Sequence, residues 1–104
     1  MNSPQKIIAH GTLGENGDTF FIASNHVLLI DAPFNIDLKL LGKQVSAAGK
    51  MGIPHSAPGI TKLLVDTLVP ADAIAVRAFE IYKSGKGGSQ LDNWLRAERE
   101  LLHF

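Results

Sequence analysis

The sequence TFFIASNHVLLID, residues 19–31, decides the predicted fold. Its two halves are rich in aromatic and β-branched residues, which favour strands, and Ser24-Asn25 between them is typical of a short turn. Residues 14–18, Gly-Glu-Asn-Gly-Asp, have the composition of a hairpin loop that follows an earlier strand. Residues 6–31 are therefore predicted to be β-rich, with three strands in an antiparallel meander.

The size and charge of the chain limit the classes of protein it can represent. Its 104 residues fit a single domain over residues 1–104. Apolar residues make up 45%, and ten Lys and Arg balance ten Asp and Glu. This balance gives no electrostatic basis for binding nucleic acid or an anionic membrane, so we expect neither as a partner.

The chain contains no cysteine, which excludes disulfides, thiolate metal sites and cysteine nucleophiles. Its first residues, MNSPQK, lack the basic start and apolar run of a secretion signal. We therefore expect a cytoplasmic protein that uses no cofactor.

Residues 35–49 fit two kinds of secondary structure. Asn35 can cap a helix, and an apolar stripe at helical spacing follows it. Alternation of apolar and polar residues over 36–40 also fits a fourth strand, and Gly42 disfavours a helix. We predict a helix for these residues and keep a strand as the alternative.

The second half of the chain predicts three helices, at residues 57–69, 72–84 and 90–103. Apolar residues recur on one helical face in each, and Ser89 with Asp92 forms the pattern of a capping box. The predicted fold class is α+β: an N-terminal three-stranded antiparallel meander followed by three or four helices that end in a helical hairpin.

The last third of the chain resembles a small bacterial domain of unknown function. The resemblance rests on residues 75–82, A-x-x-A-F-E-I-Y, on the glycine-rich loop after them, and on residues 91–101, L-D-x-W-L-x-A-E-x-E-L. That family has a helix pair of this pattern and no established activity, so the resemblance implies an architecture and no mechanism.

Few side chains are candidates for binding or catalysis. The four histidines show neither the H-x-H nor the H-E-x-x-H spacing of a local metal site, and no serine lies in G-x-S-x-G. We therefore predict no catalytic residue and no metal ligand. If the chain binds a small molecule, a pocket between sheet and helices would use His26, Asp31 and His55.

Glu98 lies on or beside the apolar stripe of the last predicted helix. A carboxylate in such a place needs a partner. Arg77 lies between Ile74 and Ile81 on the preceding helix, so a structural ion pair of Glu98 with Arg77 is predicted across the hairpin, with Lys83 as the alternative partner.

Aromatic residues suggest self-association. Adjacent Phe20 and Phe21 must face opposite sides of a strand, a three-stranded sheet leaves open edges, and Phe104 is hard to bury in a monomer; with Trp94, these are the candidate interface residues. We expect a non-catalytic cytoplasmic interaction or assembly module, acting as a homodimer or with a protein partner. The alternative is a small-ligand-binding protein or minimal enzyme.

Overall fold

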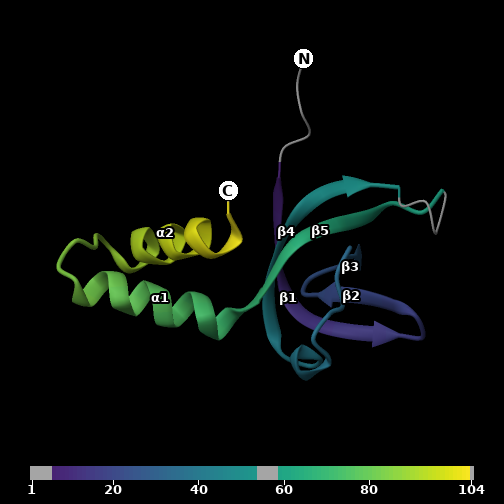
Figure 1. The fold of residues 1–104 in the computed structure, drawn as a ribbon, viewed down its shortest axis with the longest axis horizontal. Helices are drawn as coiled ribbons and strands as arrows, with labels where there is room; N and C mark the ends of the chain where they lie inside the picture. The colour runs from purple at the N-terminus through teal and green to yellow at the C-terminus, as the bar shows by residue number, and fades with distance from the viewer. Residues whose placement is uncertain (1–5, 54–58, 104) are drawn as a thin grey trace, which may run out of the picture.

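The predicted meander is present, but it forms part of a closed barrel. The computed structural model describes residues 6–53 and 59–103. Within them, a five-stranded barrel is followed by two α-helices that pack as a hairpin beside it (Figure 1). The elements in chain order are β1 (Ile7–Asn16), β2 (Thr19–Ala23), β3 (Val27–Asp31), a 3-10 turn (Leu38–Leu40), β4 (Gln44–Gly52), β5 (Lys62–Pro70), α1 (Ala71–Lys83) and α2 (Gln90–Leu102).

The barrel closes because β1 pairs with two strands. Its first half, from Ile7 to Thr12, pairs with β4, and its second half, from Thr12 to Asn16, pairs with β2. The strand order is β1-β2-β3-β5-β4, and β3 with β5 is the parallel pair. Every strand therefore has two neighbours, so the open sheet edges expected from a three-stranded meander are absent from the described barrel.

The barrel core is filled by one side of each strand. Its members are aliphatic residues with almost no exposed surface: Leu13, Ile22, Ile30, Val45, Ala47, Leu63 and Val65. A second, smaller core holds the hairpin together and contains Ile74, Ile81 and Ala97, with Val69 of β5 packed against it. The barrel and hairpin thus have separate cores joined at the β5–α1 connection.

The predicted fold class of a meander followed by three or four helices is wrong. The predicted helix 57–69 is replaced, from Lys62 onward, by strand β5, and the helix preferred for residues 35–49 gives way to the 3-10 turn and strand β4. In β5, Leu63 and Val65 enter the core while Leu64 and Asp66 face outward, which is the alternation of a strand. Pairing with β3 and β4, which are distant in sequence, outweighs the local helical spacing.

The last two helices are confirmed at nearly the predicted bounds. In α2, the Ser89 hydroxyl accepts a hydrogen bond from the Asp92 backbone N–H, and the Asp92 carboxylate accepts one from the Ser89 N–H, so the capping box is present.

Five consecutive residues of β4, 45–49, are buried, because this strand faces the barrel core on one side and the helical hairpin on the other.

Gly49 is the position in β4 that tolerates a side chain least. A Cβ there would overlap the backbone carbonyl of Leu64, whereas at Gly52 it would meet only the Cδ1 end of the Leu64 side chain. We expect Gly49→Ala to lower the free energy of unfolding by about 3 kcal/mol, and Gly52→Ala to stay within about 1 kcal/mol of wild type. Urea denaturation of both variants measures this difference. Equal losses would contradict the close packing of β4 on β5.

Candidate functional site

The residues predicted to line a ligand pocket are not brought together. His26 is exposed in the turn before β3, and Asp31 is the last residue of that strand. At about 3.3 Å per residue, the two lie roughly 16 Å apart along the chain. The Asp31 carboxylate accepts a hydrogen bond from the backbone N–H of Ala32. His55 lies outside the described residues.

The aromatic residues predicted for an interface have different surroundings. Phe20 packs against the barrel core. Phe21 lies on the outer face of the barrel, where its ring covers Gly14. Trp94 is half-buried in α2, and Phe104 lies outside the described residues.

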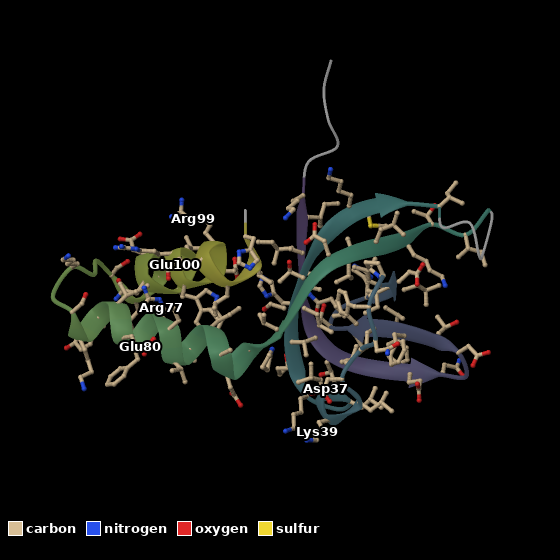
Figure 2. The ribbon with its side chains drawn as sticks, viewed as in Figure 1. Asp37, Lys39, Arg77, Glu80, Arg99 and Glu100 are labelled. Carbon is tan, nitrogen blue, oxygen red and sulfur yellow. The ribbon has the colours of Figure 1, made fainter. Side chains whose placement is uncertain are left out.

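Arg77 is part of an ion-pair group on the hairpin, but its main partner is not the predicted one. Its guanidinium donates to both carboxylate oxygens of Glu100, at 2.5 and 3.3 Å, and lies 3.6 Å from Glu80 (Figure 2). The hydrogen bond from Arg77 holds the pKa of Glu100 below its ordinary value, and Glu100 in turn raises the pKa of Arg77. The predicted pair of Arg77 with Glu98 is therefore corrected to Arg77 with Glu100.

Glu98 faces the barrel rather than α1. Its carboxylate is buried, accepts a hydrogen bond from the indole N–H of Trp94 at 3.2 Å, and lies 3.4 Å from Nε2 of His10. His10 Nδ1 is 2.9 Å from the hydroxyl of Ser46. The spacing of Glu98 on α2 indicated that it needs a partner, but only the packing of α2 against β1 decides which one.

Ser46, His10 and Glu98 form a hydroxyl–imidazole–carboxylate chain, the order found in some hydrolases. A nucleophile must be reachable by its substrate, and Ser46 is only 1% exposed. The chain links β4, β1 and α2 in sequence. We therefore interpret it as a polar connection that fixes the hairpin against the barrel.

A groove runs between the helices of the hairpin. It has a volume of about 550 Å³ and is lined by uncharged residues: Ala75, Ala78, Phe79, Tyr82, Gln90, Asn93 and Trp94. Phe79 is 58% exposed and Tyr82 65%, with their rings 6.3 Å apart. Leu91, one turn before Trp94 on α2, is also exposed, whereas Leu95 lines a separate polar depression with Lys86, Arg96 and Arg99. The seven lining residues are called the hairpin groove below.

The other side of the hairpin is charged. Arg77 and Glu80 of α1 lie with Arg96 of α2 around a shallow polar depression, and Arg96 also approaches Glu100 at 3.8 Å. On α1, Arg77, Glu80 and Ser84 follow a different line from Ala75, Phe79 and Tyr82, because residues three, four and seven apart share a helical face. The hairpin is therefore amphipathic as a unit.

Small five-stranded barrels of the OB type bind oligonucleotides on the outer face of their second and third strands. Here the outward row across β1, β2 and β3 is Gly14, Phe21 and Leu29. Residues 7–31, which form these strands and are all described, include no Lys or Arg. Binding of single strands depends on basic residues beside stacking aromatics, so this face lacks the charge that such binding needs.

Comparisons with known proteins identify no relative: no family model, no curated protein and no solved structure matches the chain. Within residues 6–53 and 59–103, neither helix has the length and apolar composition that crossing a bilayer takes. In the same part of the chain, no three or more His, Asp or Glu side chains are grouped to hold a metal ion.

The Glu98 carboxylate is expected to stabilise the junction mainly as an acceptor for Trp94. Glu98→Ala leaves the indole donor without its partner, so we expect a loss of about 1–3 kcal/mol in the free energy of unfolding. Glu98→Gln keeps an oxygen acceptor, so we expect it to retain most of the free energy of unfolding that Glu98→Ala loses. Urea denaturation measures both, and equal losses would show that the negative charge, paired with His10, matters more.

The pair of Arg77 with Glu100 predicts a pH dependence of stability. Because the folded-state pKa of Glu100 lies below its ordinary value of 4.5, the pair stabilises the fold above that pH, and the contribution is lost as pH falls through the lowered pKa. Wild type should therefore lose thermal stability more steeply than Glu100→Gln below about pH 5. Both side chains are exposed, so solvent screening keeps the effect small. If the melting temperatures of wild type and Glu100→Gln fell by the same amount from pH 7 to pH 3, the predicted contribution of this pair would be contradicted.

Proposed function

We propose that the protein is a non-catalytic cytoplasmic interaction or assembly module, acting as a homodimer or with a protein partner, and that it binds through the hairpin groove. One observation carries this proposal: an uncharged groove flanked by exposed aromatic and leucine side chains lies on a hairpin beside a closed barrel. Exposed apolar patches of this extent are typical of interaction sites.

The energetics favour the occupation of this groove. Burying the exposed part of each large side chain is worth roughly 1–2 kcal/mol, and Phe79 and Tyr82 in the groove, with Leu91 beside Gln90, all expose more than a third of their surface. Trp94 at the base of the groove is part-buried and tied through its N–H to Glu98, so the groove is held open in a fixed shape. A fixed groove reduces the entropy lost on binding.

A small apolar ligand is the second candidate occupant. The volume of about 550 Å³ lies within the range of small-molecule pockets. Asn93 and Gln90 in the lining supply polar groups that could orient such a ligand, although the Asn93 side-chain oxygen already accepts a hydrogen bond from the Gly88 N–H. A protein helix is favoured over a small ligand because the exposed residues extend beyond the groove, along both helices.

Trp94, the only tryptophan of the chain, reports on the groove by its fluorescence. We expect its emission to shift to shorter wavelength when protein concentration is raised or when an amphipathic peptide of leucine and lysine is added, because either covers the indole. Phe79→Glu should abolish the shift, and Glu15→Lys on the barrel should leave it unchanged. If neither concentration nor peptide moves the emission, the groove is not an interaction site.

A further inference from the structure

We propose that His10 is a pH-sensitive positioning residue for the hairpin groove. When its imidazole takes up a proton, it draws the Glu98 carboxylate away from the indole of Trp94 and so weakens binding in the groove. This inference rests on the proposed function and adds a means of regulating it. It is carried by three features: a shared carboxylate oxygen, the exposure of the imidazole, and the place of Trp94 in the groove.

Two donors meet the same oxygen of Glu98. Oε2 accepts a hydrogen bond from the indole N–H of Trp94 at 3.2 Å, and it lies 3.4 Å from Nε2 of His10. Both distances are at or beyond the long end of the usual range for N–H···O hydrogen bonds. Because His10 belongs to β1 and Trp94 to α2, a carboxylate that is drawn closer to His10 is expected to leave the indole.

The neutral imidazole fits its surroundings in one way. With Nε2 facing the carboxylate, the neutral ring carries its proton on Nε2, and Nδ1 accepts from the hydroxyl of Ser46 at 2.9 Å. When the ring binds a second proton, Nδ1 becomes a donor and the Ser46 hydroxyl turns to accept from it. The Nε2–H then belongs to a cation, and a hydrogen bond from a cation to a carboxylate is shorter and roughly twice as strong as a neutral one.

The imidazole is open to solvent, whereas the carboxylate is enclosed. The side chain of His10 is 53% exposed, so protons reach it from water, and that of Glu98 is 7% exposed. Histidine is the side chain whose charge ordinarily changes between about pH 5 and pH 8. An exposed ring that faces an enclosed carboxylate thus carries a change of pH into the junction of barrel and hairpin.

The described strands beside His10 place no other charge next to its ring. The residue opposite it on β4 is Ser46, and the residue opposite Ser46 on β5 is Val69. The next residues on the same face of these strands are also uncharged: Ile8, Thr12, Gln44, Ala48 and Thr67. Lys6, four residues earlier on β1, pairs with Asp66 of β5 at 3.3 Å.

On the helices, Glu98 is the charged group that faces His10. The residues one turn away from Glu98 on α2 are uncharged: Trp94, Leu95, Leu101 and Leu102. Arg77 of α1 is paired with Glu80 and Glu100. The other titratable side chains of the hairpin helices and of the α2 C-cap are exposed: Asp72, Lys83, Asp92, Arg96, Arg99 and His103. Among the Lys, Arg and His side chains that the structure describes, His10 alone lies within 4 Å of the Glu98 carboxylate.

Trp94 carries the effect into the groove. Its half-buried indole is part of the groove lining, and its N–H is held by Glu98. When the carboxylate moves towards His10, the indole loses this restraint. A groove that has to order its aromatic wall on binding loses more entropy than a fixed one, so we expect weaker binding at low pH.

The first test follows the indole N–H signal of Trp94 by NMR from about pH 7.5 to about pH 5.5, the range in which histidines change charge. The chain has one tryptophan, so the signal is unambiguous. In wild type we expect it to move upfield in one protonation step, because its hydrogen bond weakens. In His10→Gln, whose amide can donate but takes up no proton, the signal should stay in place. His26→Gln removes an exposed histidine from the turn before β3 and is the matched control, which should behave as wild type.

The second test measures the Kd of the amphipathic leucine–lysine peptide by calorimetry at the same two pH values. Loss of one hydrogen bond should raise the Kd of wild type and of His26→Gln about three- to ten-fold at the lower pH. The Kd of His10→Gln should not change with pH. Glu98→Gln keeps an oxygen acceptor without the charge that attracts the imidazolium, so its rise should be smaller than that of wild type. The range ends above about pH 5, so loss of the Arg77–Glu100 pair does not contribute.

The outcomes separate this inference from the proposed function. A Trp94 signal that titrates in wild type but not in His10→Gln, together with the rise in Kd, supports both. A signal that stays in place in wild type, or moves equally in His10→Gln, overturns the inference. A peptide that binds wild type equally well at both pH values also overturns it and leaves the proposed function standing. A peptide that binds at neither pH overturns the proposed function, and with it the regulation of the groove.

Discussion

Closure of the barrel is the constraint on which the rest of the structure depends. Strand β1 hydrogen-bonds to β4 with its first half and to β2 with its second, so the described sheet keeps no free edge. Closure gives each strand two neighbours and so reduces the free edge, although β3 and β5 pair at only two positions. Large apolar side chains are exposed on both parts of the described chain, and those of the hairpin include Phe79 and Tyr82 in its groove.

The junction of barrel and hairpin explains how the groove keeps its shape. Strand β4 is buried on both faces, and Ser46 on its hairpin side is linked through His10 to the carboxylate of Glu98. The same carboxylate accepts the indole N–H of Trp94, which forms part of the groove. This polar chain is enclosed at Ser46 and Glu98 and exposed at His10, and it connects β4 and β1 to α2.

The two sides of the hairpin differ in charge and in exposed apolar surface. Arg77, Glu80, Arg96 and Glu100 cover one side with ion pairs that stay in contact with water, where they contribute little to stability. The other side combines two small alanines with large exposed rings, a shape into which another helix fits. This uncovered apolar side of the hairpin is the feature on which the proposed interaction role rests.

The sequence by itself determined the elements that depend on local chemistry. These are the three strands within residues 6–31, the helix pair with its capping box at Ser89, and the need of Glu98 for a partner. Only the tertiary structure decided that residues 44–52 and 62–70 are strands, because their apolar spacing fits a helix locally and their hydrogen bonds go to strands far along the chain. The same holds for the partners of Glu98 and Arg77: sequence spacing places a side chain on a helical face, but the packing of the helix against its neighbours selects which charge it meets.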